Sequence, residues 1–136
     1  MSIERVNYLD ESFCENSVII SRVQCFLYLF MLKKGHPIWM SPIIEDIKGN
    51  SQLPVPKFFF DEEMIEPFPS RKKYLIETLN KALKEMESKS IVQFFSYIKE
   101  ASIDTFFEIR DDELPKQEVY HYYKDTLKKV IYQLDN

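Results

Sequence analysis

The sequence predicts an all-α fold, a bundle of four or five main helices with an irregular Pro-rich segment at about residues 36–69. Both glycines and six of the seven prolines fall between Gly35 and Pro69, and these two residue types interrupt regular structure. Elsewhere, apolar residues recur at helical spacing. The chain has 136 residues, of which 45% are hydrophobic. It is therefore long enough to bury a core, and we expect a single helical domain over residues 1–136.

The first predicted helix covers residues 13–34. Ser12 and Glu15 have the spacing of a capping box at its start. Gly35 suits the left-handed position after its end, and Pro37 prevents continuation. The middle of this helix is apolar on nearly every side, so we expect it to be the central and most buried element.

The irregular segment opens with a short predicted helix. Ser41 is the expected N-cap, Pro42 occupies the first helical position, and Gly49 closes about two turns. Pro54 and Pro56 then favour an extended chain. The sequence leaves two readings open for the next residues, one short strand or an apolar plug: Phe58, Phe59 and Phe60.

Two further helices follow at residues 71–87 and 91–100. Ser70 is the expected cap of the first, and Ser90 is the expected cap of the second. Apolar residues at helical spacing predict their buried faces: Leu75, Leu79, Ala82, Leu83, Met86, Ile91, Phe94, Phe95 and Ile98.

The last helix is predicted to begin after a cap at Asp111 or Asp112, with Pro115 in its first turn. Residues 105–110, just before it, do not distinguish helix from strand. The predicted buried face of the last helix comprises Val119, Tyr123, Thr126, Val130, Ile131 and Leu134.

Cysteine usage and hydropathy favour a cytoplasmic protein. Cys14 and Cys25 are eleven residues apart on one predicted helix, or about 16 Å along its axis, which is too far for a disulfide. The N-terminus lacks the basic start and apolar run of a signal peptide. The most apolar stretch, residues 23–32, is half the length of a membrane span, and Arg22 flanks it.

The residues needed for catalysis or metal binding are scarce. Glu118 and His121 form only half of a di-iron motif, and Lys33 would repel a metal near His36. Two separated glycines exclude Gly-rich phosphate loops and a nucleophile elbow. We therefore expect no metal, no cofactor and no enzymatic activity.

Acidic residues gather in two clusters near predicted loops and helix ends. The chain has a net charge of −4. The clusters comprise Asp61, Glu62, Glu63 and Glu66, and Asp104, Glu108, Asp111, Asp112 and Glu113. One reading is a solubilising surface that also favours helix dipoles. The other is an acidic face that steers the protein onto a basic partner.

Aromatic residues of the irregular segment, and basic residues just after it, also have two readings. Trp39 and Phe68 either plug the end of the bundle or serve as interface anchors. Arg71, Lys72 and Lys73, in a first helical turn, either pair with the acids at 61–66 or bind an anion. We expect the internal pairing, because those acids are close in sequence.

These observations favour a small acidic protein that binds and inhibits another protein. The sharpest form of this hypothesis is a bacterial immunity or antitoxin-type protein that occludes a basic, nuclease-like toxin. We expect the two acidic clusters and Trp39 to bind that partner, with no role for a membrane.

Two alternatives remain. One is a nucleic-acid-binding regulator that uses Arg71–Lys73 with Lys128 and Lys129, which the acidic net charge disfavours. The other is a small enzyme that uses carboxylates beneath the 36–69 segment.

Overall fold

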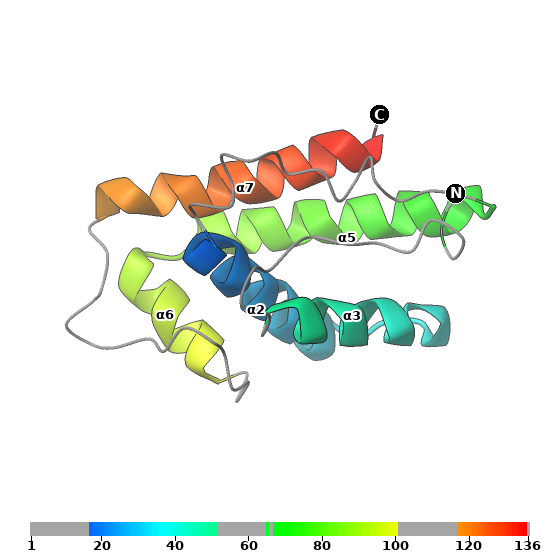
Figure 1. The fold of residues 1–136 in the computed structure, drawn as a ribbon, viewed down its shortest axis with the longest axis horizontal. Coiled ribbons are helices and arrows are strands. Elements are labelled where there is room, and N and C mark those ends of the chain that lie inside the picture. The colour runs from blue at the N-terminus through cyan, green and yellow to red at the C-terminus, as the bar shows by residue number, and fades with distance from the viewer. Residues whose placement is uncertain (1–16, 52–64, 66, 101–116, 136) are drawn as a thin grey trace.

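The protein is described here from a computed structural model, which describes residues 17–51, 65, 67–100 and 117–135. These residues form five α-helices and one 3₁₀ turn, and they contain no strand. The elements are α2 (Ser17–Lys34), η1 (Ile38–Met40), α3 (Ser41–Ser51), α5 (Pro69–Glu87), α6 (Ile91–Lys99) and α7 (Gln117–Asp135). The predicted all-α fold is confirmed (Figure 1). The segment for which a strand or a plug was predicted, Phe58, Phe59 and Phe60, lies outside the described residues.

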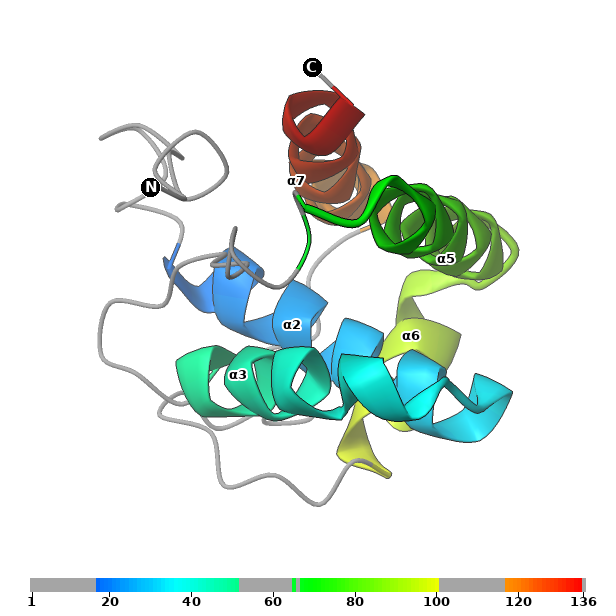
Figure 2. The same ribbon diagram turned by 90° about the vertical axis from the view of Figure 1, so that its right-hand side faces the viewer.

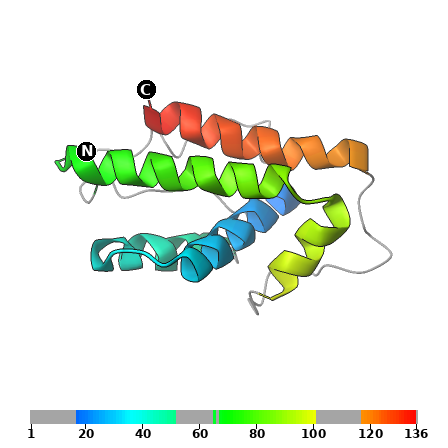
Figure 3. The same cartoon turned by 180° about the vertical axis from the view of Figure 1, so that it is seen from behind.

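The helices form two layers with α6 at one end. Helices α5 and α7 run side by side in opposite directions, and α2 crosses beneath them next to α3 (Figures 1 and 2). Seen from behind, α6 lies below the first turns of α7 (Figure 3). The Tyr120 hydroxyl, near the start of α7, donates to the Met86 carbonyl near the end of α5 at 2.8 Å. This bond fixes the antiparallel pair at that end.

Helix α2 is the central element, as the sequence predicts. Every residue from 20 to 27 is buried, and α2 contacts all four other described α-helices. Its C-terminal end also follows the prediction. Gly35 has a φ of 87° and its N–H donates to the Met31 carbonyl at 3.1 Å. A residue with a Cβ would be strained in this left-handed conformation, so glycine ends the helix.

The predicted bounds of α3 are wrong at both ends. Ser41 has helical angles, φ −53° and ψ −45°, whereas an N-cap needs an extended backbone. The turn of η1 already leads the chain into α3, so no side-chain cap is required. At the other end, α3 continues past Gly49 to Ser51. The Ser51 carbonyl accepts a bond of 2.6 Å from the Ser21 hydroxyl of α2, and this tertiary contact holds the last turn.

The start of α5 also differs from the prediction. The helix begins at Pro69 with Phe68 as its N-cap, and no side chain caps it. Ser70 therefore lies inside the helix rather than before it. The fixed φ of proline suits the first helical position, which places the helix start one residue before the predicted cap.

Helices α6 and α7 confirm most of the predicted pattern. Ser90 caps α6 in a full capping box with Gln93. The predicted buried face of α7 is confirmed for Tyr123, Thr126, Val130 and Leu134, while Ile131 is only half-buried. Tyr120 and Leu127 are buried as well. The predicted caps Asp111 and Asp112, Pro115 and the 105–110 segment lie outside the described residues.

An aromatic cluster fills the core where α2, α6 and α7 meet. Phe94 is its centre, with ring centroids of Phe26, Tyr120 and Tyr123 at 5.4, 5.4 and 5.1 Å. Phe95 extends the cluster along α6. Burial raises the pKa of Tyr120, with a smaller contribution from Tyr123. Such close aromatic contacts stabilise the core by more than the burial of their apolar surface alone provides.

Candidate protein-binding surface

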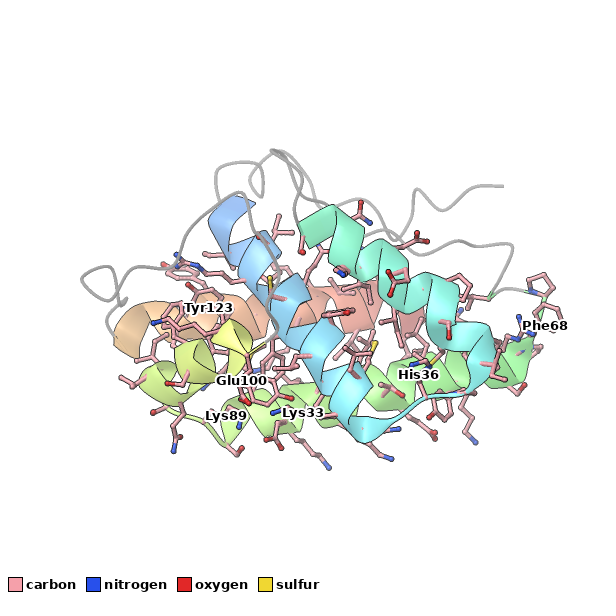
Figure 4. The ribbon with its side chains drawn as sticks, turned by 90° about the horizontal axis from the view of Figure 1, so that it is seen from below. Lys33, His36, Phe68, Lys89, Glu100 and Tyr123 are labelled. Carbon is pink, nitrogen blue, oxygen red and sulfur yellow. The ribbon has the colours of Figure 1, made fainter. Side chains whose placement is uncertain are left out.

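One end of the molecule carries an exposed group of aromatic and apolar side chains around an arginine. The start of α5 and the start of α3 lie at this same end (Figure 1). Phe68 marks the end in Figure 4, with His36 further along the bundle. We call it the end surface and define it by five residues: Ile38, Trp39, Phe68, Arg71 and Tyr74.

The turn η1 decides which way its side chains face. The Met40 N–H donates to the Pro37 carbonyl at 3.0 Å, which closes the turn. Met40 is then fully buried, Trp39 is half-buried against the core, and Ile38 is 89% exposed. Apolar exposure this large costs free energy in water, so Ile38 is a candidate contact residue.

Phe68 is presented by the start of α5. Its N–H donates to the carbonyl of Ile65 at 3.0 Å, and its own carbonyl accepts from the Arg71 N–H at 2.9 Å. Ile65 is buried in the core, so the backbone around Phe68 is anchored. The Phe68 side chain is nevertheless 43% exposed. Phe68 is therefore not a fully buried plug of the bundle end, which was one of its two readings.

Arg71 lies between two aromatic rings. Its guanidinium carbon is 4.0 Å from the Phe68 ring centroid and 5.1 Å from the Trp39 ring centroid. Each such cation–aromatic contact at a surface contributes about 0.5–1 kcal/mol. The two rings also restrict the rotamers of Arg71.

Tyr74 joins the end surface to the last turn of α2. Its ring meets the Trp39 ring edge-on, with centroids 5.8 Å apart. The Lys34 ammonium donates to the Tyr74 hydroxyl at 3.1 Å and lies 5.0 Å from the ring centroid. The surface is thus built from two segments, η1 and the start of α5, and its central side chains contact one another.

Of the ten residues predicted to bind a partner, the structure describes only Trp39. The other nine lie outside the described residues: Asp61, Glu62, Glu63, Glu66, Asp104, Glu108, Asp111, Asp112 and Glu113. The described residues and the rest of the chain nevertheless differ in net charge. The described residues contain 14 Lys and Arg and nine Asp and Glu, a net of +5, and the rest of the chain contains four and 13, a net of −9.

The basic residues named for nucleic-acid binding do not form one patch. Lys128 lies 3.9 Å from the carboxylate of Glu87, at the last residue of α5. Arg71 is in the first turn of the same helix, 16 residues earlier, or about 24 Å along the axis. The acids predicted to pair with Arg71, Lys72 and Lys73 lie outside the described residues, so that pairing stays a prediction.

The histidines make local contacts, and the described cysteine is buried. The Nδ1–H of His36 donates to the Pro37 carbonyl at 3.0 Å, and the His121 ring lies 4.1 Å from the Tyr122 ring. Burial raises the pKa of the Cys25 thiol to about 11, against smaller opposing effects of Ser51 and Arg22. No group of potential metal ligands occurs among the described residues.

Sequence reasoning missed Ile38, Tyr74 and the position of Arg71 between two rings. Trp39 and Arg71 are 32 residues apart in the sequence, and no local pattern indicates their contact. The contact of Phe68 with Arg71 had a weak signal, because residues three apart face each other at a helix start.

Comparisons with protein-family models, with curated proteins and with solved structures find no match. In the part of the chain that the structure describes, no helix is both long and apolar enough to span a membrane.

Proposed function

We propose that this chain is a protein-binding inhibitor that covers a basic partner protein, and that the end surface anchors the complex. The observation that carries the proposal is the exposure of Ile38 and Phe68 beside an arginine held between two rings. The most specific form of the proposal is a bacterial immunity or antitoxin-type protein acting on a nuclease-like toxin in the cytoplasm.

The residue types of the end surface support an interface. Tryptophan, tyrosine and arginine are the side chains that most often dominate binding energy between proteins. Here Trp39, Tyr74 and Arg71 are already packed against one another, so binding would order few new rotamers. Burying exposed Ile38 and Phe68 would add a hydrophobic contribution.

The charge distribution supports a basic partner and suggests where it lies. The described helices are net positive, so they would repel a basic protein over most of their surface. The acidic cluster of residues 61–66 directly precedes Pro67 and Phe68 in the sequence. A basic partner that contacts Phe68 would therefore meet carboxylates within a few residues of chain.

Affinity capture from the native host tests the proposal. The wild-type chain should retain a basic protein at low salt, and it should inhibit the activity of that protein once the two are purified. Reversing the charges of Asp111 and Asp112 should slow association and weaken its dependence on salt, because these acids would steer the encounter.

An Ile38→Ser/Phe68→Ala double variant tests whether capture needs the apolar side chains of the end surface or depends on charge alone. It should lose the captured protein, whereas Tyr132→Ala, which removes a ring that is 66% exposed on α7, should retain it. Recovery of nucleic acid without protein, or equal capture by all three chains, would contradict the proposal.

A further inference from the structure

Lys33 and Lys34 are adjacent lysines in the last turn of α2, and their ammonium groups have different partners. Lys33 forms an ion pair with Glu100 at 3.1 Å (Figure 4). Lys34 is also exposed, but it donates to the neutral Tyr74 hydroxyl and pairs with no carboxylate of a described residue. Because an ammonium has several N–H bonds to donate, Lys34 keeps donors for a carboxylate from another molecule.

Aromatic contacts hold the Lys34 ammonium at the edge of the end surface. It lies 5.0 Å from the Tyr74 ring centroid, and the Tyr74 ring meets the Trp39 ring edge-on. A cation over an aromatic face keeps its full charge and is covered on one side only. The charge of Lys34 therefore adjoins the same surface that exposes Ile38 and Phe68.

The described turns that meet at this end carry positive charge and no acidic residue. They are the last turn of α2, the turn η1, and the first turns of α3 and α5. Lys33 and Lys34 belong to the turn of α2, and Arg71 and Lys72 belong to the turn of α5. These turns would repel a basic segment placed on them and attract an acidic one.

We infer that the end surface binds an acidic, apolar segment of its partner protein, in which a carboxylate meets Lys34 and large apolar side chains cover Ile38 and Phe68. The inference rests on the proposed function, because it concerns the same surface, and it specifies the chemistry of the segment that docks there. The positive charge of a basic partner then lies outside this docking segment.

The apolar surroundings decide how much the contact with Lys34 contributes. A fully exposed ion pair contributes little. A carboxylate that reaches Lys34 is shielded from water by the Tyr74 ring and by the apolar side chains of its own segment, which strengthens the attraction. Removing one member of such a shielded pair mainly speeds dissociation.

Selection of random dodecapeptides displayed on phage tests the inference without knowledge of the partner. The library is selected on the wild-type chain, and clones that also bind the Ile38→Ser/Phe68→Ala variant are removed. The remaining peptides should contain an aspartate or glutamate close to leucine, phenylalanine or tryptophan. Basic peptides, or no peptides after this removal, would overturn the inference.

Synthetic peptides from these clones then identify the cation that binds them. Lys34→Gln should bind them about tenfold more weakly than wild type, whereas Lys33→Gln should stay within about twofold. Both lysines lie in the last turn of α2 and favour its dipole similarly, so this matched pair isolates the contact with the peptide. Lys34→Arg should recover most of the affinity, because it restores the charge. Equal affinity of Lys34→Gln and wild type would also overturn the inference.

The captured basic protein distinguishes failure of this inference from failure of the proposed function. If Lys34→Gln releases that protein at the wild-type rate while Ile38→Ser/Phe68→Ala loses it, the end surface remains the interface and the inference is overturned. If no basic protein is captured but acidic peptides bind through Lys34, the proposed function fails and the preference of the end surface for an acidic segment is supported.

Discussion

Arg22 and Arg71 are both arginines that lie against aromatic rings, but they occupy opposite environments. Arg22 is buried against Phe95 and Tyr123, while Arg71 is only half-buried between Phe68 and Trp39 at the surface. In the interior, the guanidinium is held by one hydrogen bond to a neutral hydroxyl and by one aromatic face, and its Nε–H has no partner. At the surface, water screens the charge, and the two rings restrict the side chain. The same contact therefore belongs to the packed core in one region and to a partly exposed surface in the other.

The largest expected effect tests the interior region. Phe94→Ala should lower the free energy of unfolding by about 3–5 kcal/mol, because it leaves a cavity at the centre of the aromatic cluster. Urea denaturation measures the change. Val92→Ala, on the exposed side of the same helix, should stay within about 0.5 kcal/mol. Similar losses in both variants would contradict the assigned orientation of α6.

The two arginines can be compared directly by substitution with alanine. Arg22→Ala should lower the free energy of unfolding by about 2 kcal/mol, because the Tyr123 hydroxyl loses a donor and the buried side chain leaves a cavity. Arg71→Ala should cost only about 1 kcal/mol, from two partly exposed cation–aromatic contacts of about 0.5 kcal/mol each. Equal costs, measured by urea denaturation, would remove the distinction between the two environments.

The helix starts of the two regions should also differ. Ser90→Ala should destabilise the protein by about 1 kcal/mol, because it removes the capping box of α6. Ser70 lies within α5, whose start at the end surface has no side-chain cap. Ser70→Ala should therefore change thermal stability by less than about 0.5 kcal/mol, and a loss as large as that of Ser90→Ala would restore Ser70 as a cap.

The smallest effect concerns the thiol of Cys25 on α2. Because burial raises its pKa from 9.0 to about 11, the folded state holds this proton more tightly than the unfolded state. The associated stability is fully present below pH 9 and is lost as the pH rises towards 11. In a Cys14→Ser background, alkylation by iodoacetamide at pH 8 should be at least about 100-fold slower in the folded than in the urea-unfolded chain. Comparable rates would show that Cys25 is accessible.

The sequence predicted what depends on neighbouring residues. Apolar spacing located the helices that became α2, α5, α6 and α7, and Gly35 marked the end of α2. The predicted caps at Ser41 and Ser70 failed because η1 and Pro69 determine those helix starts instead. Local pattern alone did not decide between these competing signals.

The environments of the two arginines could not be predicted from the sequence. Arg22 reads as the polar flank of an apolar stretch, yet Phe95 and Tyr123, 73 and 101 residues later, enclose it. Trp39 and Arg71 likewise meet only because α5 packs beside η1. Contacts between segments this distant depend on the packing of the whole bundle.

The most direct test of the proposed function is the dissociation rate of the captured basic protein, measured by surface binding kinetics. The account predicts that Ile38→Ser/Phe68→Ala releases this partner at least about 30-fold faster than wild type, because central anchors mainly control dissociation. Tyr132→Ala should stay within about twofold of the wild-type rate. Unchanged dissociation from the double variant, with its helical circular dichroism intact, would show that the partner binds elsewhere.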